Sequence, residues 1–190
     1  MRKIVFVIFC SLIVNGCGGF SWVLSGANLV HDRYYVTSAL KDQHISLMAS
    51  QALSNSPEFK DNCSISVATC NKIVLLTGHT KSWTLWKRAR QKVARISGIR
   101  RIYNYIKVRK KLKTAEYLKD AWITTKIRTK IISNFDVDPR KIKVVTDNGT
   151  VYLMGCMPRE QANMIVKMAK NTNGVKCIKR LFEYIVVVRS

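Results

Sequence analysis

The residues of this 190-residue sequence that could do chemistry are six cysteines and three histidines. Metal sites and nucleophilic sites need such side chains at short spacings, or a histidine beside an orienting acid. His31, His44 and His79 are scattered, and no CxxC pair, nucleophile elbow or glycine-rich phosphate loop occurs. A hydrolase would also need a polar cleft, which the sequence does not reveal. We therefore expect no enzyme, with no catalytic residue, metal or cofactor.

Cys17 has the clearest chemistry, because it directly follows a secretory signal. Residues 2–3 are basic, and residues 4–14 are an apolar run too short to span a bilayer, which needs about 20 residues. The run ends in "VNGC", which resembles the bacterial lipobox, where the cysteine is lipidated and becomes the first mature residue. We expect residues 1–16 to be the signal peptide and 17–42 a lipidated linker, and Gly18 implies release to the outer membrane. The alternative is a plain secretory signal with an incidental cysteine.

The other mature cysteines are Cys63, Cys70, Cys156 and Cys177. An oxidising envelope permits disulfides among them, but their connectivity cannot be read from sequence. Free buried thiols are an equally good interpretation.

The charge is strongly basic, with 33 Lys and Arg against 11 Asp and Glu and a net charge of +22. Such a charge favours polyanionic partners, namely nucleic acid, anionic lipid headgroups or acidic glycans. Compositional drift would explain the excess equally well. The secretory signal, rather than the charge, excludes nucleic acid as a partner, because it directs the chain to the cell envelope.

An internal repeat organises the mature chain. "NKIVLLTG" (71–78) aligns with "NGTVYLMG" (148–155), and the flanking segments align at nearly the same spacing. Each copy predicts the order helix, strand, strand, helix, strand, with Asn148-Gly149 as a tight hairpin turn. A three-stranded sheet with both helices on one face would bury the apolar stripes. We therefore expect an α+β fold with two tandem α-β-β-α-β domains, domain 1 (residues 43–110) and domain 2 (residues 117–187).

The first helix of domain 2, expected from about residue 119 to 134, carries one residue out of place. Ile123, Ile127 and Ile131 form an apolar stripe, and Trp122 lies roughly 140° from the centre of that stripe. In the repeat, His44 takes the place of Trp122, Met48 that of Lys126 and Ser50 that of Arg128. The difference favours a binding role for domain 2 and a scaffold or partner surface for domain 1.

Several short segments carry a family resemblance, in the same order in both copies. They are "WITTKIR", "VTDNGTVYLMG", "NGVK" and "RLFEYI" in domain 2, and "VLLTG" and "YNYI" in domain 1. Together with the lipobox, they resemble the BON-domain family, and in particular its outer-membrane lipoproteins with two BON domains. The resemblance implies a non-enzymatic protein, lipid-anchored at the periplasmic face of the outer membrane, that supports outer-membrane integrity and division-site processes. The implied partners are the anionic phospholipids phosphatidylglycerol and cardiolipin, the outer-membrane assembly machinery and regulators of peptidoglycan amidases.

The resemblance also implies a lipid-binding surface on the first helix of domain 2, and the helical wheel adds residues on the same side. A tryptophan at headgroup depth, an aliphatic anchor and flanking cations suit a membrane-surface helix. The resemblance supplies Trp122, Ile127, Arg128 and Ile132, and the wheel adds Thr125, Lys126 and Thr129. Ile127 also belongs to the core stripe, where it would hold the helix. In the alternative, Trp122 is a structural plug between the domains, and the protein is a periplasmic adaptor for outer-membrane assembly or amidase regulation.

A rival site is the basic second helix of domain 1, "KSWTLWKRARQKVAR" (81–95). Its cations could contact lipid headgroups or peptidoglycan carboxylates, with Trp83 and Trp86 as anchors. The alternative is a solvated face over an apolar stripe.

Overall fold

The computed structural model describes residues 29–60, 62–109 and 114–186. The expected signal peptide and the lipidation site at Cys17 lie outside these residues. Within the described ranges, no helix is both long and apolar enough to cross a membrane.

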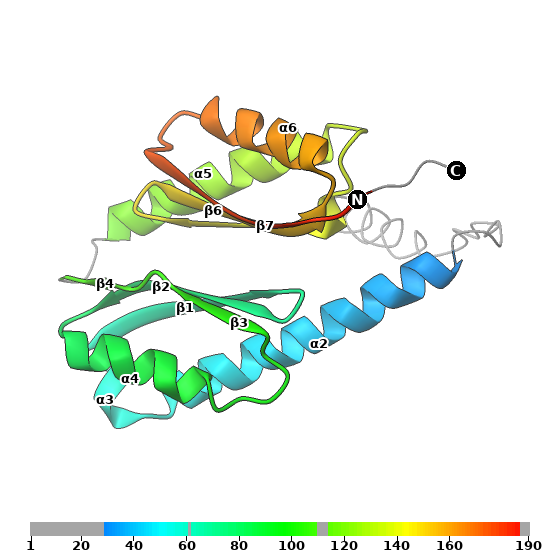
Figure 1. Cartoon of the computed structure of the whole chain (residues 1–190). Coiled ribbons are helices and arrows are strands. Elements are labelled where there is room, and N and C mark those ends of the chain that lie inside the picture. Colours follow the sequence, from blue (N-terminus) through cyan, green and yellow to red (C-terminus); the bar gives the residue numbers. More distant parts are fainter. Residues whose placement is uncertain (1–28, 61, 110–113, 187–190) are drawn as a thin grey trace, which may run out of the picture. The chain divides into compact units, whose positions relative to one another are not determined.

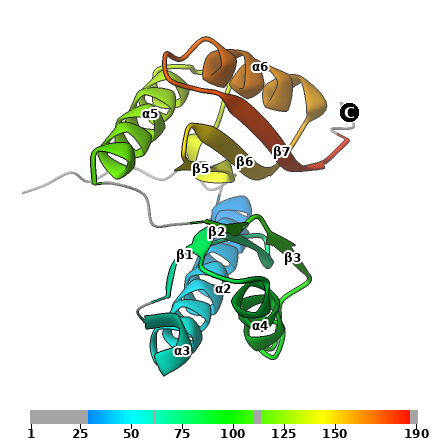
Figure 2. The same cartoon turned by 90° about the vertical axis from the view of Figure 1, so that its left-hand side faces the viewer.

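Domain 1 is a small sheet with its helices on one face (Figures 1 and 2). Strand β2 is central, antiparallel to β1 and parallel to both β3 and β4. The elements are α2 (Leu29–Ser54), α3 (Pro57–Lys60), β1 (Cys63–Cys70), β2 (Ile73–Thr80), α4 (Trp83–Val93), β3 (Arg101–Asn104) and β4 (Lys107–Val108).

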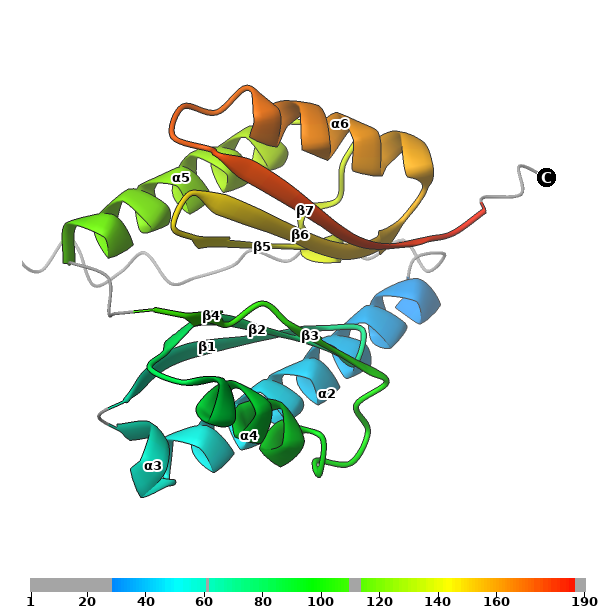
Figure 3. The same cartoon turned by 60° about the vertical axis from the view of Figure 1, so that its left-hand side comes forward.

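Domain 2 repeats this arrangement, with α5 and α6 on one face of a three-stranded sheet (Figure 3). Strand β6 is central, antiparallel to β5 and parallel to β7. The elements are α5 (Thr114–Ile132), the short 3-10 helix η1 (Pro139–Lys141), β5 (Ile142–Asp147), β6 (Thr150–Met157), α6 (Arg159–Lys170) and β7 (Cys177–Tyr184). The predicted α+β class, with two tandem α-β-β-α-β units, is confirmed.

The helix starts differ from the predictions. Helix α2 begins at Leu29, so part of the expected linker is helical, and α5 begins at Thr114 rather than near residue 119. Neither glycine nor proline occurs within α2 or α5, so nothing in the backbone chemistry stops either helix earlier. The short β4 of domain 1 was also not predicted.

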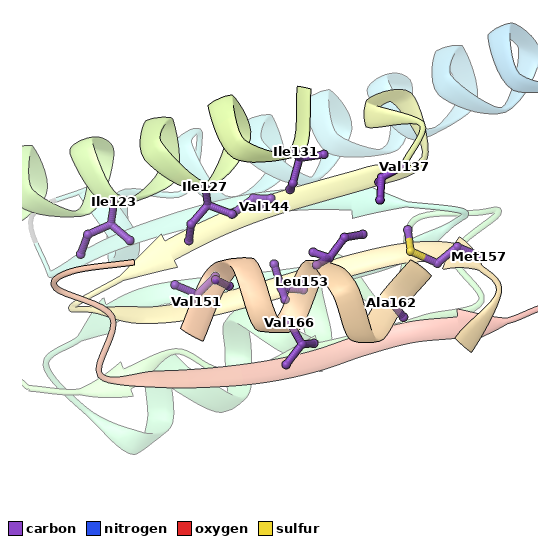
Figure 4. Close-up of a cluster of buried hydrophobic side chains, with 12 residues drawn as sticks. Ile123, Ile127, Ile131, Val137, Val144, Val151, Leu153, Met157, Ala162 and Val166 are labelled. Atoms are coloured by element: carbon purple, nitrogen blue, oxygen red, sulfur yellow. The ribbon is translucent and has the colours of Figure 1, made fainter. Parts of the chain in front are cut away.

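Each domain has its own core between helices and sheet. In domain 2, residues of α5 and α6 pack on Val144, Val151 and Leu153 of β5 and β6 (Figure 4). In domain 1, Ile45 and Ala49 of α2 and Ala89 and Val93 of α4 pack on β2. A third buried cluster draws members from both repeats: Ala68, Ile73, Leu75, Tyr152, Met154 and Leu181.

The described cysteines are all free thiols: Cys63, Cys70, Cys156 and Cys177. Burial raises the pKa of Cys70 to about 12, with the nearby Asp42 carboxylate adding to the effect. Because the thiolate is the reactive form, the Cys70 thiol is chemically quiet at neutral pH.

Candidate functional site

Helix α5 is fixed in rotation by its isoleucine stripe. Ile123 is 5% exposed, Ile127 is 0% exposed and Ile131 is 1% exposed. All three point from α5 toward the sheet (Figure 4). A helix held by three buried side chains at four-residue intervals has one defined outward face. The buried core therefore determines which side chains of α5 face the solvent.

The outward face of α5 carries Trp122, whose side chain is 61% exposed. The Lys126 ammonium lies 5.0 Å from the centroid of the indole ring, within the range of a cation–π contact. Thr125 and Thr129 are exposed on the same side, and Ile132 is 67% exposed at the end of the helix. A structural plug between the domains would be covered, so this exposure favours the surface role for Trp122.

The Thr125 hydroxyl on this face and the nearby Ser133 hydroxyl are already bonded to the helix itself. Thr125 Oγ1 donates to the Ala121 carbonyl at 3.0 Å, and Ser133 Oγ donates to the Thr129 carbonyl at 2.9 Å. A hydroxyl bonded to its own helix needs no further partner when water is removed. The Thr125 hydroxyl therefore adds little desolvation cost when this face approaches an apolar or interfacial environment.

Arg128 flanks the face and does not belong to its centre. Its guanidinium Nη2 donates to the Val144 carbonyl on β5 at 3.4 Å, although the side chain is exposed. The cation is therefore held beside the sheet edge, at the border of the Trp122 face.

Ile127 is a correction to the implied lipid-binding set. Its side chain is completely buried between α5 and the sheet, so it cannot touch a surface without unfolding the domain. Its position in the middle of the Ile123/Ile131 stripe is the physical reason.

Ile127 and Ile132 form a matched pair on one helix. Replacing Ile127 with alanine should lower the free energy of unfolding of domain 2 by about 2–5 kcal/mol, because it leaves a cavity in the core. Replacing Ile132 with alanine should change that energy by less than about 0.5 kcal/mol, because this side chain is exposed. Urea unfolding followed by circular dichroism measures both values. Equal losses for the two variants would contradict the assignment of the two faces.

Two exposed apolar residues were not predicted for this surface, and they extend it at both ends. Leu118 lies one turn before Trp122 and is 67% exposed, and Phe135 follows the helix and is fully exposed. Leu118 was missed because the helix was expected to start after it, yet its four-residue spacing from Trp122 was a usable signal. A row of exposed apolar side chains of this kind is typical of interaction surfaces and makes this face the candidate site. We call Leu118, Trp122, Thr125, Lys126, Thr129, Ile132 and Phe135 the α5 outer face.

A cavity of about 350 Å³ opens beside Trp122 at the start of α5. The indole forms part of its wall, and two cations, Lys119 and Lys176, stand among its residues. Lys176 Nζ also donates to Asn148 Oδ1 at 3.2 Å. The cavity is lined by Glu116, Lys119, Asp120, Trp122, Ile123, Asn148, Gly149, Asn173, Gly174 and Lys176.

Asp120 anchors the start of α5 and was also missed. It is 7% exposed and accepts hydrogen bonds from the backbone N–H groups of Asn148 at 2.6 Å and Gly149 at 2.8 Å. Those residues form the predicted hairpin turn, with φ of 49° and 73°. Domain 1 repeats the device, because Asp42 accepts from the N–H groups of Asn71 and Lys72 at 2.6 and 2.7 Å. The signal was an aspartate at matching places in the two copies.

Comparison with known proteins gives relatives that this chain matches over more than two thirds of their length. The chain is 32% identical to the 21 kDa hemolysin of Actinobacillus pleuropneumoniae, covering 70% of this chain and 69% of the relative. It is 24% identical to the outer membrane lipoprotein DolP of Haemophilus influenzae, covering 97% of each chain. It is 28% identical to the osmotically-inducible protein Y of Escherichia coli, covering 76% of this chain and 73% of that protein.

The family model for the BON domain matches twice, at residues 41–110 and 119–185. The two matches contain the two repeated sheets with their helices, and the second contains most of the α5 outer face. The chain therefore belongs to the BON-domain family.

Proposed function

We propose that this chain is a non-enzymatic lipoprotein of the outer membrane that binds anionic phospholipid bilayers through the α5 outer face. The observation that carries the proposal is the 61% exposure of Trp122 on a helix whose other side is fully buried. Its similarity over 97% of its length to an outer membrane lipoprotein supports the location, as does the lipobox ending at Cys17.

The chemistry of the outer face suits a bilayer interface. An indole prefers headgroup depth, where its ring is apolar and its N–H stays hydrated, and Ile132 and Phe135 supply aliphatic and aromatic anchors farther along. Burying one such side chain contributes about 1.5–3 kcal/mol. Each lysine or arginine near an anionic surface adds about 1 kcal/mol, which gives Lys126 and Arg128 a role at the border.

Phosphatidylglycerol and cardiolipin are the lipids we propose, since both place a phosphate and no compensating cation at the surface. We further propose that this binding supports outer-membrane integrity and division-site processes, with outer-membrane assembly factors and amidase regulators as protein partners. These partners rest on the family resemblance, whereas the bilayer contact rests on the α5 outer face.

Trp122→Ala should weaken binding to anionic vesicles between about tenfold and a hundredfold, because the indole contributes the largest apolar contact. The experiment uses a soluble form of the protein that begins at Gly18 and retains every residue of the buried cores. Co-sedimentation with phosphatidylcholine vesicles, with and without phosphatidylglycerol, measures the effect.

His44→Ala is the control, because His44 holds the matching place on α2 and is also exposed. It should leave vesicle binding unchanged. If Trp122→Ala lowers the melting temperature and leaves vesicle binding intact, Trp122 is structural and the adaptor function takes precedence. If the wild-type protein shows no preference for anionic over zwitterionic vesicles, the lipid proposal is wrong.

A further inference from the structure

The positive charge of the chain is concentrated in one stretch that the α5 outer face does not use. Residues 62–115 contain 14 Lys and Arg and no Asp or Glu, so they hold 14 of the 33 basic residues. Domain 2, by contrast, mixes both signs, with seven acidic residues between Glu116 and Glu183. A stretch of one sign creates a field that attracts polyanions.

Helix α4 presents the centre of this stretch to solvent (Figure 3). Ser82 caps its start by accepting from the Leu85 N–H at 3.3 Å, and Ala89 and Val93 are completely buried against the sheet. Trp83 is 71% exposed, the most exposed tryptophan among the described residues. Lys87 and Arg90 are exposed four and seven residues later, which places them on the same side as Trp83.

The Trp83 indole is held in place by its neighbour. Its ring packs edge-to-face on Trp86, with the centroids 5.8 Å apart, and Trp86 is half-buried against the core of domain 1. The Trp83 ring therefore packs on Trp86 on one side and is exposed to solvent on the other. The one ion pair recorded for a cation of α4 in the described part of the chain joins Arg88 to Glu58, so Lys87 and Arg90 carry uncompensated charge.

The repeat shows that the fold does not require this surface. Helix α6 takes the same place in domain 2, and at the 76-residue spacing that pairs Gly98 with Gly174 it has Arg159 for Trp83 and Asn163 for Lys87. Arg90 matches Val166, which is 8% exposed and belongs to the core. Both helices pack on the core of their own domain, α4 through Ala89 and Val93 and α6 through Ala162, Ile165, Val166 and Ala169, so an exposed tryptophan with following cations is not a requirement of the fold.

We propose that the α4 outer face, made of Trp83, Lys87 and Arg90, is a second contact surface for anionic phospholipid bilayers, separate from α5. Trp83 and Lys87 have the same four-residue spacing as Trp122 and Lys126, so each domain carries one exposed tryptophan with a following lysine. Because Trp83, Lys87 and Arg90 lie on one side of the helix, a flat bilayer can contact the ring and both cations together. A free anion would engage the cations and leave the indole in water.

All vesicle-binding measurements for the α4 outer face use a Trp122→Ala protein. This variant removes the proposed α5 contact, so that the remaining binding reports on α4. In that background, Trp83→Ala should weaken binding to phosphatidylglycerol-containing vesicles on the order of tenfold. Lys87→Gln with Arg90→Gln should weaken it about fivefold for each charge removed. Lys167→Gln with Lys170→Gln on α6 removes the same charge from the matching helix and should have a much smaller effect.

Depth is measured with a protein that keeps Trp83 as its single tryptophan, the other three being replaced with phenylalanine. Addition of vesicles containing brominated lipid should shift the Trp83 emission to the blue and quench it. Circular dichroism checks that every variant retains its fold, and Trp83→Phe, which keeps an aromatic ring, should bind better than Trp83→Ala.

The outcomes of the two proposals separate. Loss of binding on Trp83→Ala with no effect of Trp122→Ala would leave the α4 face standing and remove the α5 proposal. Equal losses from the α4 and α6 charge pairs, without quenching of Trp83, would mean unspecific attraction and would overturn the α4 proposal. It would equally be overturned if Trp83→Ala reduced binding to purified peptidoglycan and not to vesicles, since the partner would then be a glycan.

Discussion

Replacing Gly78 with alanine is expected to lower the free energy of unfolding of domain 1 by about 3–5 kcal/mol, a large share of the stability of a small domain. Gly78 has φ of +105°, which side chains rarely adopt, and an added Cβ would lie 2.0 Å from the Ser64 carbonyl oxygen. That oxygen belongs to the backbone of β1 and cannot rotate away. Urea unfolding of the soluble chain, followed by circular dichroism, measures the loss.

Gly98→Ala is the matched control for this prediction. Gly98 also has a positive φ of +84°, but its added Cβ would meet only the end of the Ile45 side chain, at 3.9 Å. The variant therefore has the backbone strain without the clash and should lose only about 1–2 kcal/mol. If Gly78→Ala and Gly98→Ala lost the same free energy of unfolding, the positive φ alone would explain both losses. The close approach of β1 to Gly78 would then make no contribution to stability.

The matching glycine of domain 2 is constrained by sterics. Gly155 follows Gly78 at the repeat spacing, and its added Cβ would lie 2.5 Å from the Lys141 carbonyl oxygen. In domain 1 the glycine therefore lets β2 approach the backbone of β1, and in domain 2 it lets β6 approach the backbone at the end of η1, directly before β5. The "LLTG" and "YLMG" segments that revealed the repeat thus end on a packing requirement.

Asp120→Ala should destabilise domain 2 by about 2–4 kcal/mol. The substitution leaves the Asn148 and Gly149 N–H groups without the carboxylate that now accepts from both, and Gly149 is buried. Hydrogen bonds to a charged acceptor are worth more than neutral ones, and water can replace the carboxylate only in part. Differential scanning calorimetry of the soluble chain records the change.

Two further variants sharpen this prediction. Asp120→Asn keeps one acceptor oxygen and should fall between the wild-type protein and the alanine variant. Asp136→Ala removes an exposed carboxylate from the same domain and should change stability by less than about 0.5 kcal/mol. A stable Asp120→Ala protein would show that water satisfies the turn and that the aspartate has another role.

The features of the fold that depend on periodicity and on the internal repeat could be predicted from the sequence. The element order, the hairpin turn at Asn148-Gly149 and the buried Ile123/Ile127/Ile131 stripe follow from local patterns and are found in the structure. Trp122 could be placed opposite the stripe because a helix has a fixed angle per residue. These inferences need no knowledge of distant contacts.

What could not be predicted depends on tertiary contacts and on helix ends. The starts of α2 and α5 carry weak signals, so Leu118 fell outside the expected helix, and Phe135 lies in a turn with no periodic pattern. Asp42 and Asp120 bond to turns about 29 residues away, a pairing that only the folded chain reveals. Ile127 could be assigned to the core from its stripe, although the family resemblance placed it on the surface.

The separation of α5 into a buried side and an outer side has an evolutionary consequence. Because the buried Ile123, Ile127 and Ile131 and the Asp120 carboxylate hold the helix from its inner side, substitutions at the Trp122 side are nearly neutral for folding. Lineages can therefore alter which surface they recognise one residue at a time, without passing through unstable intermediates. The two domains of this chain show that freedom within a single molecule. Both keep buried apolar residues at the three inward positions (Ile45, Ala49 and Leu53 in domain 1), while their outward positions differ.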